Sequence, residues 1–339
     1  MSWRSPRLLP DLARRLLARD RDAVAEALNL IDDSRPARRE AALALLDALE
    51  RSLEARPEGA CAGAPRIGVT GAPGAGKSTL LDALVRRLRR RGETVGIVVV
   101  DPSSRLSGGA LLGDRARVRA SADDAGVFLR SMAARERLGG LADATAASVA
   151  VLAAVFDRVF VETVGVGQSE AEVSELADTL LFVAQPGAGD VLQFMKAGVL
   201  EHPDVFAVNK ADLGAAAERT ASELEAGLAL AATPTGGWRR PVLLVSARDG
   251  LGVDALLEAL DAHRAHLVAS GELRERRLRG RAAFVIGALE RRYGSHGLER
   301  VGGRPAVGAR VEGDPARGGF AWIAEIGREI EDALRKPRT

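Results

Sequence analysis

A glycine-rich loop between a strand-like and a helix-like segment constrains the fold of this 339-residue chain more than any other feature. Residues 71–78 match the pattern G-x-x-x-x-G-K-[ST], follow the apolar run Ile67–Thr70 and precede leucines at helical spacing. Glycines let successive backbone N–H groups curl around phosphate oxygens, and the N-terminus of the following helix adds its dipole. A glycine-rich turn that contains a lysine by chance lacks this context, so the pattern predicts a P-loop nucleotide-binding site.

The P-loop supplies most of the predicted nucleotide-binding residues. We expect Lys77 to reach the terminal phosphates, which also makes it a candidate catalytic residue, and the Ser78 hydroxyl to coordinate Mg²⁺. The nucleotide-binding residues predicted in this loop are Gly71, Ala72, Pro73, Gly74, Ala75, Gly76, Lys77, Ser78 and Thr79.

Short β-rich runs alternate with longer amphipathic stretches from Arg66 onward, which is typical of βαβ units. The runs are nearly continuous in Val, Ile, Leu and Phe, as expected when helices cover both faces of a sheet. The predicted strands are Ile67–Thr70, Thr94–Val100, Val127–Leu129, Arg158–Glu162, Thr179–Ala184, Val205–Val208 and Val242–Val245. The predicted fold class is therefore α/β, with a mainly parallel sheet covered by helices.

Helical segments flank the predicted sheet on both sides. The tail has helical pieces around Arg274–Arg292 and Trp322–Arg335, with a glycine-rich stretch over Gly294–Gly319 between them. Because this tail is too small and interrupted for a core of its own, we expect a helical arm that packs on another subunit. The predicted parts are an N-terminal helical region (1–60), the P-loop domain (61–268) and the C-terminal helical extension (269–339).

A second motif, Asn209-Lys210-Ala-Asp212, directly follows the apolar run Val205–Val208. The carboxyl ends of strands are where α/β sheets place ligand contacts. A carboxylate at Asp212 can accept from both N1–H and the exocyclic amine of guanine, whereas adenine offers an acceptor at N1. Ser246 and Ala247 end the next strand and are similar to the GTPase loop whose backbone contacts guanine O6. Together with the P-loop, these residues predict binding of GTP and GDP instead of ATP.

A third motif ends the predicted strand that reaches Glu162. Glu162-Thr-Val-Gly165 reads as the D-x-x-G switch of GTPases with Glu in place of Asp. Glu162 is expected to meet Mg²⁺ through water, and Gly165 to donate its N–H to the γ-phosphate, so phosphate loss would release the loop. Val166 stands where Ras-like GTPases carry the glutamine that orients water, so we predict slow basal hydrolysis. Gln168, in the same loop, is a further candidate catalytic residue.

Two more acidic positions complete a possible metal site. Asp101 ends the predicted strand Thr94–Val100, and Asp114 follows a glycine-rich run that suggests a mobile switch. A lone loop aspartate is more often a turn or cap residue, and spacing alone leaves both readings open. The candidate metal ligands are Ser78, Asp101, Asp114 and Glu162.

Several of these segments together resemble the MeaB/ArgK family, the methylmalonyl-CoA mutase-associated GTPase chaperones. The resemblance spans roughly residues 65–252, and 162–170 is its most specific part. The segments that carry it are Asp101-Pro-Ser-Ser, Gly108-Gly to Gly113-Asp114, Glu162 to Glu170, Gly187-Ala-Gly-Asp190 and Val208 to Asp212.

The resemblance implies a homodimeric GTPase that binds an adenosylcobalamin-dependent acyl-CoA mutase, gates cofactor loading and protects the mutase. By position, Asp101, Asp114 and Glu162 would join Ser78 around Mg²⁺. Arg117, Asp190 and Lys196 are implied as catalytic residues: Arg117 would face the phosphates, and the other two would couple hydrolysis to the mutase. Val191 and Ala197 replace the acid and second lysine that family members often carry there, so the preferred partner can differ.

Composition excludes several other classes of protein. No apolar run approaches the roughly 20 residues that span a bilayer, and Met1–Asp20 interleaves charges with leucines, unlike a secretory signal. Cys61 is the only cysteine, which excludes an internal disulfide and a cysteine-based zinc site. The 48 basic residues nearly balance the 46 acidic ones, and the run Arg86–Arg91 lacks interleaved aromatics, so no nucleic-acid partner is expected. We predict a cytoplasmic protein.

Three alternatives concern cofactors and other activities. Asp261-Ala-His263-Arg-Ala-His266 is similar to the D-x-H-x-x-G pattern of cobalamin-binding domains, but the glycine is missing and a helix is predicted there. We interpret these histidines as ordinary surface residues and assign adenosylcobalamin to the partner. A small-molecule or transport-protein kinase is disfavoured by the guanine motif. A nickel-insertion GTPase usually displays His or Cys clusters, which this chain lacks.

Overall fold

The computed structural model describes residues 8–33, 35–54, 63–102, 124–134, 141–163, 173–187, 202–230 and 237–335. The chain forms two compact units. A helical unit combines residues 1–64, 135–157 and 276–339, and a sheet unit combines residues 65–134 and 158–275. The helical unit is thus assembled from three separate parts of the chain.

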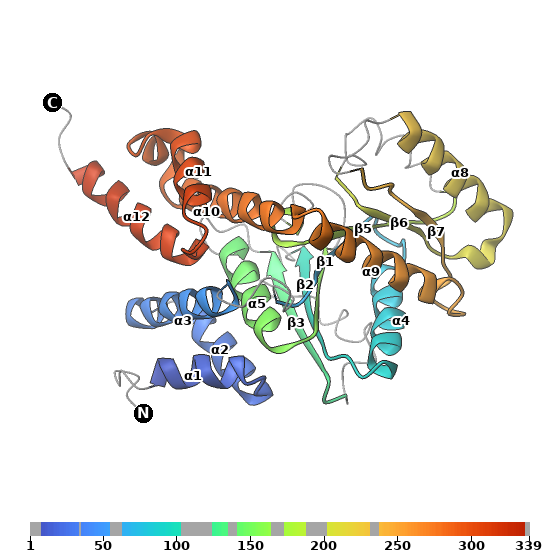
Figure 1. Cartoon of the computed structure of the whole chain (residues 1–339), viewed down its shortest axis with the longest axis horizontal. Coiled ribbons are helices and arrows are strands. Elements are labelled where there is room, and N and C mark those ends of the chain that lie inside the picture. The colour runs from blue at the N-terminus through green and yellow to red at the C-terminus, as the bar shows by residue number, and fades with distance from the viewer. Residues whose placement is uncertain are drawn as a thin grey trace. The chain divides into compact units, whose positions relative to one another are not determined.

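The sheet unit contains seven parallel strands in the order β3-β2-β4-β1-β5-β6-β7 (Figure 1). The strands are β1 (Arg66–Thr70), β2 (Val95–Pro102), β3 (Val127–Ala134), β4 (Arg158–Thr163), β5 (Thr179–Ala184), β6 (Val205–Val208) and β7 (Val242–Leu244). Each predicted strand is present, and the predicted α/β class with a parallel sheet is confirmed. The largest extension is that of β3, which continues five residues beyond the predicted Leu129 because it pairs with β2 along its whole length.

The central strand β1 pairs with β4 on one side and with β5 on the other. In this register Val69 lies opposite Glu162 of β4 and opposite Leu181 of β5. Because parallel strands end at the same edge, the loop after β1 emerges between the ends of β4 and β5. Gly68 is required in this strand, since a Cβ there would lie 2.6 Å from Cγ1 of Val173.

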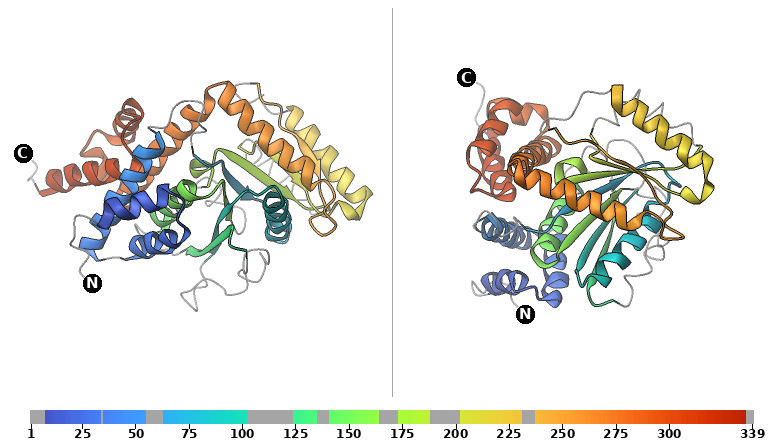
Figure 2. Two further views of the ribbon diagram at one scale, coloured as in Figure 1. Left: turned by 60° about the horizontal axis from the view of Figure 1, so that its bottom comes forward. Right: turned by 45° about the vertical axis from the view of Figure 1, so that its right-hand side comes forward.

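Helices cover both faces of the sheet, because successive side chains of each strand point to opposite faces and most of them are apolar. On one face α4 (Lys77–Arg90) packs beside α9 (Val253–Ala269) (Figure 2). Both helices bury leucines against Leu181 and Val183 of β5. On the opposite face α8 (Ala215–Leu230) follows the short 3-10 helix η3 (Ala211–Leu213). There Phe182 of β5 and Phe206 of β6 form a core cluster with α8, their ring centroids 5.8 Å apart.

The helical unit begins with three helices, within the stretch for which the sequence predicted a helical region. These are α1 (Leu8–Leu17), α2 (Arg21–Asp32) and α3 (Pro36–Glu54), and they contact α5 (Leu141–Val155). Helix α5 is apolar on nearly every side, and its described side chains from Thr145 to Val155 are all buried. An apolar helix of this kind is stable only when other helices surround it.

The tail contains α10 (Glu272–Glu299), α11 (Gly303–Gly313) and α12 (Gly319–Arg335). The prediction of a glycine-rich interruption between two helical pieces is wrong, because α11 forms inside it. Val307 and Val311, four residues apart, are both fully buried, and this apolar stripe stabilises a helix in spite of the glycines. Helix α12 contacts α3, so the tail packs on an N-terminal helix of its own chain.

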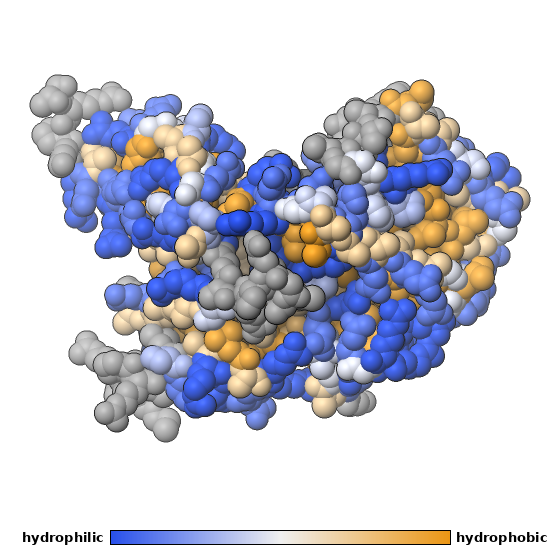
Figure 3. All heavy atoms as spheres, in the orientation of Figure 1, coloured by the Kyte–Doolittle hydropathy of each residue, from blue (hydrophilic) through white to orange (hydrophobic). Residues whose placement is uncertain are grey.

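Hydrophilic residues cover most of the face shown in Figure 3, in line with a chain of which 28% is charged. None of the helices in the described part of the chain combines the length and the apolar character that crossing a lipid bilayer requires.

Candidate nucleotide-binding site

The P-loop connects β1 to α4 and depends on glycine at three positions. Gly71, Gly74 and Gly76 have φ values of 138°, 81° and 87°, a region that other residues adopt at a cost. A Cβ on Gly71 would lie 2.1 Å from the Val183 carbonyl oxygen of β5, so the loop runs directly against the neighbouring strand. This close approach holds the loop at the carboxyl edge of the sheet.

Lys77 is the first residue of α4, and its side chain is buried. Its Nζ donates to the carbonyl oxygens of Gly71 at 2.7 Å and of Ala72 at 3.0 Å. A buried ammonium needs acceptors of this kind. The Lys77 ammonium group therefore binds to the backbone of the P-loop itself. Phosphate oxygens of a bound nucleotide would compete with these two carbonyl oxygens for its N–H donors.

Ser78 and Glu162 bring the P-loop and β4 together. Ser78 Oγ donates to Glu162 Oε1 at 2.7 Å, and the Glu162 side chain is only 2% exposed. Hydroxyl and carboxylate oxygens are the ligands that Mg²⁺ takes, so these two residues fit the predicted metal. Asp101 lies near the end of β2, while its side chain and Asp114 are outside the described residues. Among the residues that are described, no group of three or more His, Cys, Asp or Glu is gathered as a metal site.

The second motif contacts the first through the buried side chain of Asn209. Its Nδ2 donates to the Ala75 carbonyl at 2.9 Å, and its Oδ1 accepts from the Ala247 backbone N–H at 3.1 Å. Lys210 has a left-handed φ of 61°, and its Nζ donates to the Gly74 carbonyl at 2.8 Å. The loops that follow β1, β6 and β7 therefore meet at one place.

Asp212 lies in η3, and its carboxylate faces Ser246. Ser246 Oγ donates to Asp212 Oδ1 at 3.0 Å, and the Asp212 side chain is 22% exposed. The Ala211 N–H donates to the carbonyl of Val245, which keeps η3 against the end of β7. A partly exposed carboxylate held in this way is available to a ligand that presents two N–H donors.

Sequence reasoning missed three residues of this region. Gln185 Oε1 accepts from Lys210 Nζ at 2.9 Å, and Arg248 Nη2 lies 3.1 Å from Asp212 Oδ2. Asp249 Oδ2 accepts from Ser246 Oγ at 3.0 Å. Gln185 directly follows β5, the strand beside β1, and Arg248 and Asp249 directly follow Ala247. Their positions next to a strand end or a motif residue are the only sequence features that could have indicated them.

Pro73 and Thr79 are exposed parts of the loop and of the first turn of α4. The predicted catalytic residues Arg117, Gly165, Gln168, Asp190 and Lys196 lie outside the described residues.

The interpretation of His263 as a surface residue is wrong. The helix α9 is present as predicted, but His263 is 1% exposed because it shares the inner face of α9 with Leu260 and Leu267. Its Nδ1 lies 2.8 Å from Thr179 Oγ1, and its Nε2 lies 3.4 Å from Asp204 Oδ1. His266 is half-buried, with its ring centroid 5.4 Å from that of Trp238. His263 thus belongs to the protein interior, whereas His266 keeps partial exposure to solvent.

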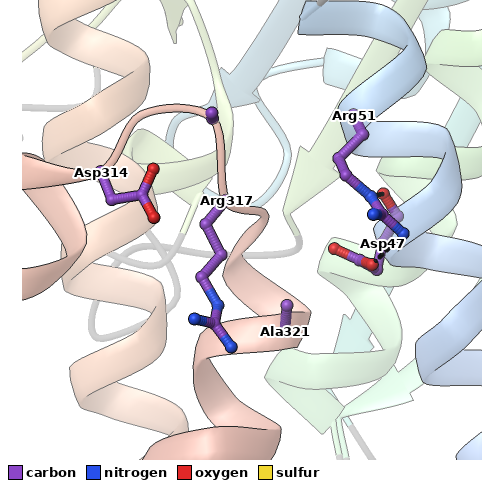
Figure 4. A pocket seen from close by; sticks show the side chains of 6 residues that line it. Asp47, Arg51, Asp314, Arg317 and Ala321 are labelled. Carbon is purple, nitrogen blue, oxygen red and sulfur yellow. Dashed lines mark hydrogen bonds and ion pairs between the residues drawn. The ribbon is translucent and has the colours of Figure 1, made fainter.

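A polar hollow of about 320 Å³ lies apart from these motifs, within the helical unit. Asp47 and Arg51 of α3 line one side, and the segment from Asp314 to Ala321 lines the other (Figure 4). Arg51 bends onto Asp47 at 2.6 Å, and the Arg317 guanidinium lies over the Trp322 ring at 4.6 Å. Both cations already have partners within the protein, and none of the predicted site residues lies here.

Comparison with known proteins places these motifs in context. A family model described as methylmalonyl Co-A mutase-associated GTPase MeaB matches residues 24–293. A putative GTPase of Pyrococcus abyssi is 47% identical over 214 residues, which cover 62% of this chain and 66% of that protein, just under two thirds of its length. The methylmalonic aciduria type A homolog, mitochondrial, of Mus musculus is 33% identical over 286 residues, or 82% of this chain and 68% of that protein.

A solved structure shares the fold. The crystal structure of a LAO/AO transport system kinase superposes with a TM-score of 0.67 at 26% identity, over 97% of this chain and all of the other.

Proposed function

Because this chain belongs to the MeaB family of methylmalonyl-CoA mutase-associated GTPases, we propose that it is a GTP-driven chaperone of an adenosylcobalamin-dependent acyl-CoA mutase. It binds GTP with Mg²⁺ and hydrolyses GTP to GDP and phosphate at a low basal rate. The observation that carries this proposal is the Asn209 side chain, which joins the P-loop carbonyl of Ala75 to the backbone of Ala247. This contact supports a single site that grips phosphate and base together.

The Asp212 carboxylate selects the base. Guanine presents N1–H and the exocyclic amine to it, whereas adenine presents an acceptor at N1 and leaves the carboxylate without donors. A site built on such hydrogen bonds discriminates by about 10⁴ or more. The position of Asp212 beside the buried Ser246 supports this role, since the hydroxyl orients one oxygen and leaves the carboxylate partly open.

At the phosphate end of the site, cationic groups stabilise the negative charge of the nucleotide phosphates. Lys77 would exchange its two loop carbonyls for phosphate oxygens, and the oxygens of Ser78 and Glu162 would hold Mg²⁺ beside them. When bound, Mg²⁺ neutralises charge that develops on the phosphates. Asp101 and Asp114 are proposed as its further ligands. Gly165 binds the γ-phosphate, while Arg117, Gln168, Asp190 and Lys196 are proposed to act in hydrolysis and in its coupling to the mutase.

The partner proposed is the mutase, on which adenosylcobalamin resides, and the chaperone gates its loading and protects it. The engagement of His263 with Thr179 and Asp204 supports a cofactor on the partner instead of on this chain. We further propose a cytoplasmic homodimer whose contacts include the C-terminal arm, without a nucleic-acid or membrane partner.

Titration of GTPase activity with several acyl-CoA mutases tests the proposal. Isolated protein should turn over GTP more slowly than about 1 s⁻¹, and one mutase should raise that rate and co-purify. Methylmalonyl-, ethylmalonyl-, isobutyryl- and hydroxyisobutyryl-CoA mutases form the panel. If none stimulates turnover or binds, the chaperone role is wrong.

A kinase is the second candidate, because the structural relative at a TM-score of 0.67 is titled a transport system kinase. GTP labelled on the γ-phosphate separates the two functions. The GTPase releases labelled free phosphate, whereas a kinase leaves the label on an acceptor molecule. Calorimetry with GTP and ATP in the presence of Mg²⁺ tests the base specificity, and equal affinity for the two would contradict the role of Asp212.

A further inference from the structure

The carboxylate proposed to bind guanine already contacts a cation of the same chain. Arg248 Nη2 lies 3.1 Å from Asp212 Oδ2, while Asp212 Oδ1 accepts from Ser246. The Arg248 side chain is 75% exposed, so the contact is at the surface and the guanidinium has room to move away. Any role of Arg248 at the base-binding end of the site rests on the proposed function, since it presupposes that Asp212 binds guanine.

Arginine and guanine present the same chemical group to a carboxylate. A guanidinium carries N–H donors on nitrogens that share one carbon, in a planar fork that fits a carboxylate. Guanine presents N1–H and its exocyclic amine, also on nitrogens that share one carbon. Arg248 and the guanine base therefore compete for one acceptor, because Asp212 Oδ2 cannot serve both at full strength.

Asp249 offers Arg248 a second acceptor one residue along the chain. Arg248 Nε donates to Asp249 Oδ1 at 3.1 Å, and its Nη2 lies 3.4 Å from Asp249 Oδ2. The hydrogen bond with Arg248 lowers the pKa of the Asp249 carboxyl, which keeps this acceptor ionised. When a guanine base binds to Asp212, the Arg248 guanidinium loses that contact but keeps its hydrogen bonds to Asp249.

Ser246 links the two carboxylates. Its hydroxyl lies 3.0 Å from Asp212 Oδ1 and 3.0 Å from Asp249 Oδ2, yet it has one proton to donate. The Asp249 backbone N–H lies 3.3 Å from the same Oγ. Two neighbouring carboxylates that share one hydroxyl repel each other, and the Arg248 guanidinium offsets that repulsion while the base is absent.

We propose that Arg248 is an internal competitor for the guanine site, mimicking the donor edge of the base on Asp212, and that Asp249 receives it when the nucleotide binds. Arg248 thereby lowers the rate and affinity of guanine-nucleotide binding, and Asp249 raises both. Exposed ion pairs of this kind shift an equilibrium by roughly twofold to fivefold, so effects of that size are expected.

Stopped-flow binding of a fluorescent GDP analogue to the full chain tests the proposal. Arg248→Ala should lower the dissociation constant about twofold to fivefold, chiefly through faster association. Asp249→Asn should raise it by a similar factor, because Arg248 then has Asp212 alone, and the double variant should behave as Arg248→Ala does. Arg219→Ala, on an exposed position of α8, is the matched control and should leave binding unchanged.

Two results would overturn the proposal. If Arg248→Ala weakens binding through faster dissociation, the arginine holds the bound base, for instance by stacking on it, and is no competitor. If neither Arg248→Ala nor Asp249→Asn changes binding, the contact has no role. Both outcomes require that the wild-type chain binds GDP, whereas a wild-type chain that does not bind it contradicts the proposed function itself.

Discussion

Asn209 donates its side-chain Nδ2 to the Ala75 carbonyl at 2.9 Å and so connects the end of β6 to the P-loop. The contact is buried and crosses 134 residues of sequence. A Cβ on Gly76 would lie 2.5 Å from the same Nδ2, so the loop has a glycine where the amide packs against it. The part of the site predicted for the base thus supports the part predicted for the phosphates.

Replacing Asn209 should therefore affect both stability and binding. Asn209→Ala leaves the Ala75 carbonyl and the Ala247 N–H without their partner, which should lower the free energy of unfolding by about 1–3 kcal/mol. GTP affinity should fall as well, because the P-loop loses a support. Urea denaturation and calorimetry measure the two effects. Asn29→Ala, at an exposed position of α2, is the control and should change neither.

Glu162→Gln tests the proposed metal site without removing a side chain. The amide oxygen can still accept from Ser78, but the negative charge near the metal is lost. The Mg²⁺ concentration needed for half-maximal GTPase activity should rise by about tenfold or more, as for other residues that contact a metal through water. Nucleotide binding in the presence of a chelator should be nearly unchanged. The same shift in Glu218→Gln, at an exposed position of α8, would argue against a specific site.

Gly71→Ala should destabilise the chain through a clash and not only through backbone strain. The new Cβ would lie 2.1 Å from the Val183 carbonyl oxygen, and φ is 138°. We expect a loss of about 2–5 kcal/mol in the free energy of unfolding. Gly92 also has a positive φ, 80°, but a Cβ there would meet nothing within 4 Å, so Gly92→Ala should cost only about 1–2 kcal/mol. Equal losses in urea denaturation would contradict the close approach at Gly71.

Tyr293 gives the helical unit a measurable alkaline transition. Burial and the hydrogen bond that Oη donates to Glu331 raise its pKa from 10.0 to about 12. Below pH 10 the phenol is protonated in both states, so its full contribution to stability is present. As the pH rises from about 10 to about 12, the unfolded chain releases this proton first, and stability falls.

Tyr293 is the only tyrosine, so the near-ultraviolet absorbance of tyrosinate reports its titration directly. Tyr293→Phe should remove that part of the pH dependence of unfolding, and Glu331→Gln should move the titration to lower pH. A tyrosinate titration centred at pH 10 in the folded protein would contradict the contact with Glu331.

The strands and the two nucleotide motifs were predictable because their signals are local. Short apolar runs rich in β-branched residues, such as Val205–Val208, are typical of buried parallel strands. The P-loop glycines permit backbone angles that other residues resist. The motif from Asn209 to Asp212 directly follows β6, so the rule that ligands bind at the carboxyl ends of strands was enough to predict its position beside the P-loop.

Other features depended on which segments meet in space. The helix α11 forms in a glycine-rich stretch because Val307 and Val311 find a core, and helix propensity alone predicts otherwise. His263 is buried because its side of α9 faces the sheet, a fact that a helical pattern by itself does not reveal. Arg248 contacts Asp212 because η3 lies against the end of β7, where the loop with Arg248 and Asp249 begins.

The amino-acid sequence by itself thus determined the parallel sheet, the P-loop and the place of the motif proposed to select the base, since each is encoded within a few consecutive residues. Only the tertiary structure decided that the tail packs with α3 of its own chain, that Asn209 supports the P-loop and that Arg248 lies on Asp212. Those contacts join residues that the order of the strands and the packing of the helices bring together, and no local pattern specifies that arrangement.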